Sequence, residues 1–357
     1  MPTSRLIHIR RKLLGWYTRN RRDLPWRRTR DPYAIWIAET MLQQTQVKTV
    51  LPYYARFMGA FPNIESLDRA SEEKVLALWS GLGYYRRAEN LKKAARKILL
   101  NHRGKLPQEF SALCTLPGIG SYTAGALMSI AFNQPYPALD GNARRLLTRI
   151  FNVKREKDLR EIAQQLVSPS HPGHFNQAVM DLGSTICLAR NPRCPSCPLT
   201  RFCAAKKSAR FDYRRPSAKR QIIDIDWPVA LIEKDGKILL HRRPRGGLLG
   251  GLWELPGGER KKRESLKAAL SRHLNGLGKQ VKVHSRIGEI RHGITHHKIR
   301  APLFTFVLSN HKKPRLPRGN WRWFSPSALG RYPLSSLSLK AIKHLILLQK
   351  RRDMSSE

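Results

Sequence analysis

Four cysteines close together in the chain are the residues whose type and spacing point most directly to metal chemistry. They are Cys187, Cys194, Cys197 and Cys203, spaced C-x6-C-x2-C-x5-C, so one loop after a helix could place all four around one metal centre. A structural zinc site usually has two separated ligand pairs, and this segment has a single CxxC pair. The spacing leaves zinc open, and a cluster of buried reduced thiols is a weaker alternative. A fifth cysteine, Cys114, lies in an apolar helical stretch and is expected in the core.

Two carboxylates lie in settings that suit acid and base chemistry. Glu39 lies in YAIWIAETMLQQTQV, where three of its four helical neighbours are apolar, so an ionised side chain there would be poorly solvated. A neutral Glu39 could donate a proton, and the alternative is an interior glutamate paired with an arginine. Asp140, in LDGNARRLLTRIF, fits the N-cap of a helix, and capping alone could account for it. Cleavage of a glycosidic bond needs one acid to protonate the leaving group and one anion to stabilise an oxocarbenium ion, and this pair could serve that purpose.

A glycine-containing turn, LPGIG, separates two helical patterns in LCTLPGIGSYTAGALMSIA, and Ser121 is expected to cap the second helix. Pro117, Gly118 and Gly120 allow a tight turn whose backbone N–H groups can face a phosphate at a helix N-terminus. Such a turn would bind DNA regardless of base sequence. The alternative is an ordinary connection between two helices.

The charge of the chain indicates the class of partner. Its 357 residues include 67 Lys and Arg against 25 Asp and Glu, a net charge of +42, and both halves are basic. This excess is more than solubility requires, so nucleic acid is the expected partner. The sequence has no apolar run of membrane-spanning length, so we expect no membrane association. The first residues lack the pattern of an export signal, which predicts a cytoplasmic protein, associated with the nucleoid in a bacterium.

The elements that must position these residues change type near residue 205. From residue 6 to about 203, apolar residues recur at three- and four-residue spacing, which predicts an all-α region. Within it, SEEKVLALWSGLG predicts a helix capped by Ser71 and stopped at Gly81, and a longer helix is expected to end near Gly104. Residues 206–220 carry seven basic residues and one acidic residue with little apolar periodicity, which predicts a linker.

Beyond the linker the apolar spacing changes to two residues. Asp235 and Gly236 between apolar runs predict a β-hairpin. Further strands are expected in IGEIRHGIT, IRAPLFTFVLS and WRWFS, with a short helix over residues 264–274. The second domain is therefore predicted to be α+β.

Several of these motifs together resemble a known family. LPGIGSYTA, LDGN and the four-cysteine loop resemble the helix-hairpin-helix DNA glycosylases. LPWR, AETMLQQTQV and GLGYYRRAENL narrow the resemblance to adenine DNA glycosylases of the MutY type. RRPRGGLLGGLWELPGGE resembles the start of that family's Nudix-like domain, so the resemblance covers both domains.

The resemblance implies a multidomain protein, with an all-α helix-hairpin-helix glycosylase domain that carries an Fe-S cluster loop, followed by an α+β Nudix-like domain. The catalytic region would span residues 1–205, with a six-helix barrel over about 31–134 and a cluster module from 1–30 and 135–205. A basic linker would span 206–226 and a lesion-recognition domain 227–350. The four cysteines would hold a [4Fe-4S] cluster, and the protein would act as a monomer on double-stranded DNA.

The implied reaction, a step of base excision repair, hydrolyses the N-glycosidic bond of adenine mispaired with 8-oxoguanine or guanine. By this resemblance Glu39 is the acid that protonates adenine N7, and Asp140 stabilises the cationic sugar or its covalent adduct. Tyr122 and Asn142 would support them. Relatives that cut the strand carry a Schiff-base lysine where this chain has Tyr122, so a monofunctional glycosylase is expected.

The resemblance also implies residues that contact DNA. The adenine pocket would be lined by Trp26, Arg27, Leu42 and Gln177. The lesion strand would be held by Gln44, Thr45, Leu82 and Tyr84, and the hairpin glycines Gly118 and Gly120 would contact phosphates. Tyr84 would be wedged into the base stack, because a flipped base leaves a gap that something flat must fill. For Tyr85, packing is the expected role.

Two other functions remain as alternatives. A Nudix hydrolase would bind Mg²⁺ through a carboxylate-rich helix, but the corresponding segment offers Glu259 and Glu264 with Lys, Ala, Arg and His at the other positions. We therefore interpret this domain as a lesion-sensing module. A DNA-binding protein without catalysis could lack Glu39 and Asp140, and both are present.

The segment EIRHGITHHKI departs from the family pattern. The family usually carries Phe-Ser-His at this hairpin, and this chain has Ile294, Thr295 and His296. Thr295 keeps a hydroxyl group that can donate and accept, so Thr295 and His296 are expected to read 8-oxoguanine. The alternative is an exposed hairpin tip without DNA contact.

Overall fold

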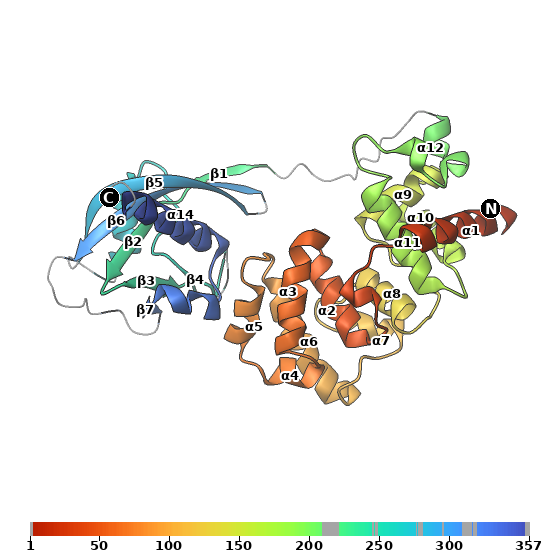
Figure 1. Ribbon diagram of the computed structural model, residues 1–357, viewed down its shortest axis with the longest axis horizontal. Helices are drawn as coiled ribbons and strands as arrows, with labels where there is room; N and C mark the ends of the chain where they lie inside the picture. Colours follow the sequence, from red (N-terminus) through yellow and green to blue (C-terminus); the bar gives the residue numbers. More distant parts are fainter. Residues whose placement is uncertain are drawn as a thin grey trace. The chain divides into compact units, whose positions relative to one another are not determined.

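The computed structural model describes residues 3–208, 221–244, 246, 249–275, 277, 281–294, 296–308, 316 and 320–353. The chain forms two compact units, which we call the helical unit (Met1–Ala70 with Arg86–Pro216) and the sheet unit (Ser71–Tyr85 with Ser217–Glu357). The predicted change from an all-α region to an α+β domain is confirmed (Figure 1).

The described part of the helical unit consists of helices and the turns between them. In chain order these are α1 (Thr3–Asn20), η1 (Pro25–Arg27), α2 (Pro32–Leu42), α3 (Val47–Ala60), α4 (Ile64–Arg69), α6 (Arg86–His102), α7 (Phe110–Cys114), α8 (Ser121–Ile130), α9 (Gly141–Phe151), α10 (Glu156–Leu166), α11 (Pro172–Thr185), η2 (Cys194–Ser196), η3 (Thr200–Phe202) and α12 (Ala204–Lys207). As predicted, the long helix α6 ends just before Gly104, whose φ is +76°. A helix commonly ends beside such a glycine, because glycine has no Cβ to oppose a positive φ.

Helix α2 is the buried helix of this unit and packs against α3, α6 and α8. It begins where the Asp31 side chain accepts hydrogen bonds from the backbone N–H groups of Tyr33 and Ala34, with Pro32 at the first helical position. All residues from Tyr33 to Met41 are buried, including Glu39. The helix therefore carries a carboxyl group into the interior.

A second core lies where the two ends of the helical unit meet. Helix α1 packs against α10 and α11, and α11 packs against α8 and α9. Ile9, Leu13, Leu146, Leu166 and Leu182 are each at most 1% exposed in this core. Burying each such side chain contributes about 1.5 to 3 kcal/mol, so α1 is held firmly against the helices that precede the cysteine loop.

The LPGIG segment forms the predicted turn between α7 and α8. Gly118 has a φ of +81°, and a Cβ there would lie 2.9 Å from the Cβ of Asn90, so this position needs glycine. The prediction that Ser121 caps α8 is wrong, because the N-cap is Gly120 and Ser121 is already helical. No described side chain caps this end, so its first-turn N–H groups keep their capacity to bind an anion.

The prediction that Cys114 lies in the core is also wrong. Cys114 is exposed at the end of α7, while Leu113 is fully buried. Successive residues of a helix point about 100° apart, so the buried Leu113 turns its neighbour outward.

The sheet unit is built on a mixed sheet. Its elements are α5 (Glu72–Trp79), β1 (Ile223–Asp226), β2 (Val229–Lys234), β3 (Lys237–Arg242), β4 (Trp253–Glu254), α13 (Leu266–His273), β5 (Val281–Ile294), β6 (His297–Leu308), β7 (Trp321–Phe324), η5 (Pro326–Arg331) and α14 (Ser336–Asp353). The strand order is β1-β6-β2-β3-β4, with β5 paired to β6 and β7 paired to β3. The predicted hairpin is confirmed, since Lys234 pairs with Lys237 around Asp235 and Gly236, both at positive φ.

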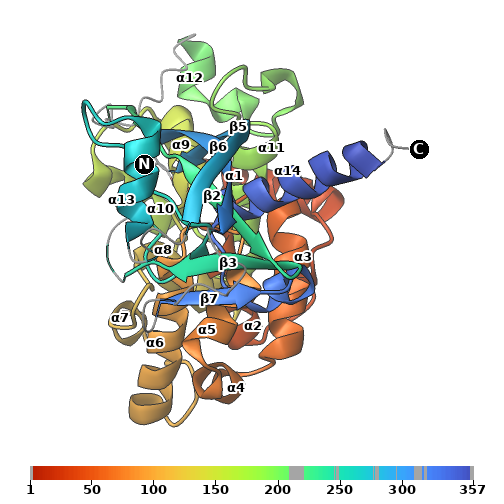
Figure 2. The same ribbon diagram turned by 90° about the vertical axis from the view of Figure 1, so that its left-hand side faces the viewer.

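Helices α13 and α14 cover opposite faces of this sheet (Figure 2). Leu270 and Leu274 pack with Ile232 and Phe306 on one face. Leu337 and Ala341 pack on the other face with strand residues that include Leu303. The predicted short helix corresponds to α13, whose N-cap is Ser265, whereas α14 was not predicted.

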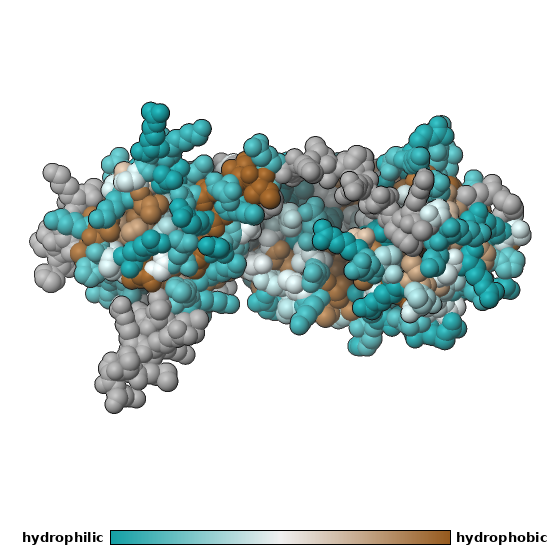
Figure 3. Space-filling model, turned by 90° about the horizontal axis from the view of Figure 1, so that it is seen from above, coloured by the Kyte–Doolittle hydropathy of each residue, from teal (hydrophilic) through white to brown (hydrophobic). Residues whose placement is uncertain are grey.

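The described helices include none that is long and apolar enough to cross a bilayer. Hydrophilic residues predominate on the face drawn in Figure 3, as the net charge of +42 requires.

Candidate active site

Glu39 is the buried acid of the helical unit. Its side chain lies on α2 and the residue is 4% exposed. Burial raises the pKa of Glu39 to about 7, a hydrogen bond from Tyr122 lowers it, and the nearby charge of Asp140 raises it further. Burial outweighs the hydrogen bond, so the carboxyl group is partly protonated near neutral pH.

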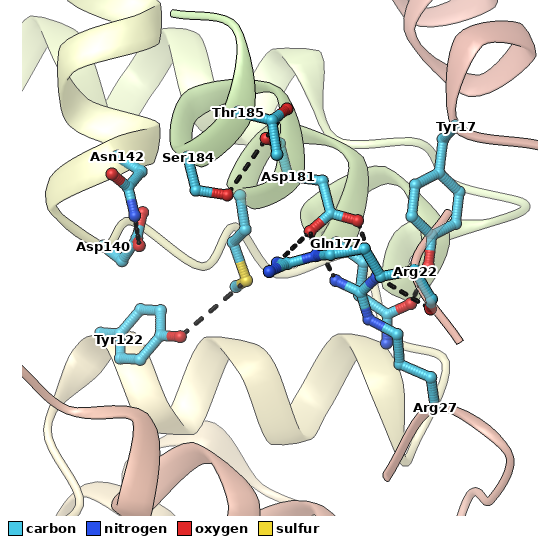
Figure 4. A network of polar contacts seen from close by, with 11 residues as sticks. Tyr17, Arg22, Arg27, Tyr122, Asp140, Asn142, Gln177, Asp181, Ser184 and Thr185 are labelled. Carbon is cyan, nitrogen blue, oxygen red and sulfur yellow. Dashed lines mark hydrogen bonds and ion pairs between the residues drawn. The ribbon is translucent and has the colours of Figure 1, made fainter. Parts of the chain in front are cut away.

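Tyr122 fixes which oxygen of Glu39 can carry the proton. The Tyr122 hydroxyl, on the first turn of α8, donates to Glu39 Oε2 at 2.5 Å. The same hydroxyl lies 3.9 Å from Met180 Sδ, and Figure 4 draws this contact as a dashed line from Tyr122 to sulfur. Burial and the Glu39 carboxylate raise the pKa of Tyr122 well above its ordinary value, so the phenol stays a donor. The proton of a neutral Glu39 therefore belongs on Oε1.

Asp140 is held at both oxygens. The predicted N-cap is confirmed, because Oδ1 accepts from the backbone N–H of Ala143 at 2.6 Å. Oδ2 accepts from Asn142 Nδ2 at 2.9 Å. Burial raises the pKa of Asp140, while the bonds from Ala143 and Asn142 and the charge of Arg145 oppose that rise. The site thus holds two acids that differ in hydrogen bonding, one bonded by a phenol and one bonded by amides.

A chain of hydrogen bonds joins Asp140 to the cysteine loop. Asn142 Oδ1 accepts from Arg145 Nη2 at 2.8 Å, and Arg145 Nε donates to the carbonyl of Cys187 at 2.8 Å. Helices α9 and α11 approach closely here, since a Cβ on Gly183 would lie 2.8 Å from the Cβ of Asn142. The orientation of Asp140 is therefore tied to the first cysteine of the loop.

The predicted pocket residues Arg27 and Gln177 lie together, with partners that the sequence analysis missed. Arg27 donates to Asp181 Oδ2 at 2.6 Å and to Oδ1 at 2.9 Å, and the Tyr17 hydroxyl donates to Gln177 Oε1 at 2.5 Å (Figure 4). Arg27 and Gln177 also line one cavity of about 200 Å³. Asp181 is 1% exposed and also pairs with Arg22. The signal available in the sequence was a single acidic residue within the otherwise apolar stretch AVMDLG.

The other two predicted pocket residues lie on neighbouring elements. Trp26, on η1, is buried with its ring edge-on to Tyr54 at a centroid distance of 5.1 Å. Leu42 is half-buried at the last position of α2.

The turn after α2 carries Gln44 and Thr45 and is held by Arg87, which the sequence analysis also missed. Gln44 is exposed at a φ of +59°, and Thr45 Oγ1 accepts from Arg87 Nη2 at 3.2 Å. Arg87 Nη1 donates to three carbonyls at the end of α2, at 2.6 to 3.0 Å. A buried guanidinium thus binds the orphan carbonyls of the helix C-terminus, where positive charge is favoured.

Among the other predicted DNA-contact residues, Leu82, Tyr84 and His296 lie in the sheet unit. Leu82 is 6% exposed, whereas Tyr84 is 44% exposed at a φ of +49°. The His296 ring lies against that of His297, with ring centroids 4.1 Å apart and the rings tilted by 38°, and Thr295 lies outside the described residues. The hairpin glycines Gly118 and Gly120 are in the helical unit, as described above.

The four predicted cysteine ligands line one cavity. The buried Arg149 guanidinium lies against it, with Nη1 3.4 Å from Cys187 Sγ. Among the described residues, no three His, Cys, Asp or Glu side chains lie close enough to share a single metal ion. Four thiols that line one cavity beside a buried guanidinium fit an anionic group held by four thiolates.

The carboxylates of the Nudix-like segment are engaged by cations. Arg272 donates to both oxygens of Glu264, and the bond from Arg272 lowers the pKa of Glu264 to about 2. Arg272 Nη2 also donates to the carbonyl of Glu259. An arginine thus already neutralises Glu264, which leaves this carboxylate poorly suited to bind a Mg²⁺ ion.

Comparison with known proteins matches both units to families. Residues 37–172 match the HhH-GPD superfamily of base excision DNA repair proteins, and residues 228–344 match the NUDIX domain. The human adenine DNA glycosylase is 33% identical over 89% of this chain and 70% of its own length. The mouse adenine DNA glycosylase is 34% identical over 89% of this chain and 74% of its own length. A thermostable thymine-DNA glycosylase is 31% identical, with a TM-score of 0.55 over 57% of this chain and 98% of that structure.

Proposed function

Because the chain belongs to the adenine DNA glycosylase family, whose members are base excision repair enzymes, we propose that it hydrolyses the N-glycosidic bond of adenine opposite 8-oxoguanine or guanine in duplex DNA. The observation that carries this proposal is the buried Glu39, with a pKa of about 7 and its Oε2 bonded by Tyr122. A general acid works best when its pKa lies near the working pH.

In the proposed reaction Glu39 gives its Oε1 proton to N7 of the flipped adenine. The bond between C1′ and N9 then breaks, and its electron pair leaves with the neutral base. Asp140 stabilises the positive charge on the sugar, since its carboxylate is held by Ala143 and Asn142. Water adds to C1′ and returns one proton to Glu39. Tyr122 occupies the position of the strand-cutting lysine, so the product keeps an intact strand.

Substrate binding in the proposal falls to further residues of both units. The adenine pocket is formed by Trp26, Arg27, Leu42 and Gln177, of which Arg27 and Gln177 line one cavity. Gln44, Thr45, Leu82 and Tyr84 hold the lesion strand, and Gly118 and Gly120 bind backbone phosphates. Thr295 and His296 read the 8-oxoguanine.

We also propose that Cys187, Cys194, Cys197 and Cys203 hold a [4Fe-4S] cluster. Their shared cavity and the neighbouring Arg149 support this assignment. The cluster would supply a structural link for the loop. The hydrogen bonds from Cys187 through Arg145 and Asn142 then keep Asp140 in place.

The proposal is tested by single-turnover release assays on duplexes with adenine opposite 8-oxoguanine, guanine, cytosine and thymine, each with and without alkali. We expect adenine release opposite 8-oxoguanine and guanine, and strand breaks only after alkali. Glu39→Gln and Asp140→Asn should keep lesion-DNA affinity and nearly abolish adenine release. Each substitution keeps the shape of the side chain and removes the carboxyl group that donates a proton or carries the negative charge. Substantial release by either variant would remove that residue from its role, and strand breaks without alkali would refute the monofunctional mechanism.

A further inference from the structure

The turn that follows α5 presents one exposed aromatic side chain on a strained backbone. Gly81, Gly83 and Tyr84 all have positive φ, at +95°, +77° and +49°. Tyr84 is 44% exposed, whereas Leu82 beside it is buried. A tyrosine at positive φ is strained and persists only where the surroundings impose this conformation.

Hydrogen bonds within the turn impose part of this shape. Trp79, which is fully buried, donates from Nε1 to the carbonyl of Gly83 at 3.1 Å. The backbone N–H of Gly81 donates to the Tyr85 hydroxyl at 3.1 Å. Hydrogen bonds therefore hold both neighbours of Tyr84, the Gly83 carbonyl on one side and the Tyr85 hydroxyl on the other.

Further hydrogen bonds join the turn to Leu334, in the C-terminal part of the sheet unit. Ser80 Oγ donates to the Leu334 carbonyl at 2.9 Å and accepts from the Leu334 N–H at 3.2 Å. The Tyr85 hydroxyl donates to the same carbonyl at 3.1 Å. The Tyr85 hydroxyl thus bonds both Gly81 and Leu334, so Tyr85 does more than the packing that the sequence predicted.

Leu334 is itself fixed in the domain. It is 1% exposed and forms a parallel bridge with Trp253 of β4. The Trp253 ring donates from Nε1 to Glu73 Oε1 at 2.9 Å, on the first turn of α5. Both ends of α5 are therefore fastened to the same place in the sheet unit.

We propose that Ser80 and Tyr85 are positioning residues that fix the Tyr84 side chain to the C-terminal domain, so that lesion recognition by this domain and insertion of Tyr84 into the base stack are coupled. This inference rests on the proposed function, in which Tyr84 enters the DNA. The bonds to Leu334 make the wedge and the lesion-reading strands parts of one body. A lesion bound by the domain then sets where the aromatic ring enters the stack.

The test uses the full chain and a duplex with adenine opposite 8-oxoguanine, carrying 2-aminopurine beside the lesion. The fluorescence of 2-aminopurine rises when its base is unstacked by an inserted side chain. Ser80→Ala with Tyr85→Phe should lower this rise and should slow single-turnover release by roughly tenfold, because the pair loses the bonds that join the turn to Leu334. A triple variant that adds Tyr84→Ala should lose as much fluorescence rise and rate as Tyr84→Ala alone. The reason is that the positioning residues act only through Tyr84.

Tyr33→Phe is the matched control. It also removes a phenol that donates to a backbone carbonyl, that of Phe61 at 2.8 Å, but lies in the helical unit. It should leave the fluorescence rise unchanged. If the double variant is poorly folded, Tyr85→Phe alone keeps the ring and removes only the hydroxyl.

A normal fluorescence rise in these variants would overturn the coupling. So would a triple variant whose loss of rate is the product of the losses caused by Tyr84→Ala and by the double variant. Failure of the proposed function would be seen separately, as no adenine release by the unmodified protein.

Discussion

At the scale of single residues, the chemistry of Glu39 follows from competition between burial and hydrogen bonding. One phenol bond does not compensate for removing a carboxylate from water, so burial keeps the pKa near 7. Burial also raises the pKa of Asp140, but two amide donors and the nearby charge of Arg145 oppose that rise and favour its ionised form. Two carboxyl groups in one interior are thus given different partners, the pattern expected for an acid and an anionic stabiliser.

The raised pKa of Glu39 predicts how the rate depends on pH. The acid form is needed, so single-turnover adenine release should fall as pH rises through about 7, approaching a tenfold loss per pH unit above it. The measurement is the release rate between pH 5 and 9 at saturating enzyme, with lesion-DNA affinity measured at each pH as the control. A rate that keeps rising above pH 8 would contradict Glu39 as the acid.

At the scale of elements, the cysteine loop is a segment with little regular structure to support it. Its described helices are η2, η3 and α12, each of three or four residues, too short to be stable alone. The bonds from Arg145 and Arg149 to the residues around Cys187 connect it to α9. Ligation across the loop is what would hold the rest of it together.

Cys197→Ser should therefore lose the brown colour and bound iron of an iron-sulfur protein, along with most of its DNA affinity. Cys114→Ser is the matched control, because Cys114 is an exposed thiol outside the loop, and it should retain both. The measurements are iron content, visible absorption and binding to a lesion duplex. Unmodified protein prepared anaerobically with stoichiometric zinc and no iron would refute the cluster.

At the scale of the whole molecule, the charge is far larger than the ion pairs within the protein can neutralise. All 25 acidic residues together could pair with fewer than half of the 67 basic ones. The remaining cations repel one another in the free protein, and binding to a polyanion relieves that repulsion. Phosphate contact should thus dominate affinity, while the buried site decides the chemistry.

This charge predicts a steep salt dependence of DNA binding. With about 6 to 10 phosphates neutralised, affinity should fall by roughly 10³ to 10⁵ between 50 and 200 mM salt. Fluorescence anisotropy on matched duplexes with and without the lesion would measure it, and we expect similar slopes for both. A slope of log affinity against log salt near −1 would show that the positive charge has another purpose.

Local patterns determined the elements whose causes lie within a few residues. The Asp140 cap, the helix that starts after Ser71 and the turn at Asp235 and Gly236 were each confirmed. Each depends on one side chain and the adjacent backbone, or on two residues that tolerate positive φ, so the sequence contains the whole cause. The family was also readable, because its motifs are short and continuous, and the comparisons bear it out.

Contacts between distant segments were decided only by the tertiary structure. The bonds of Arg27 with Asp181, of Arg87 with the end of α2 and of Tyr85 with Leu334 join residues 154, 46 and 249 positions apart in the chain. No local periodicity records such a partner, because which buried cation meets which carbonyl or carboxylate depends on how helices and strands pack. The exposure of Cys114 and the cap at Gly120 were missed for a related reason, since a shift of one residue along a helix changes the face on which a side chain lies.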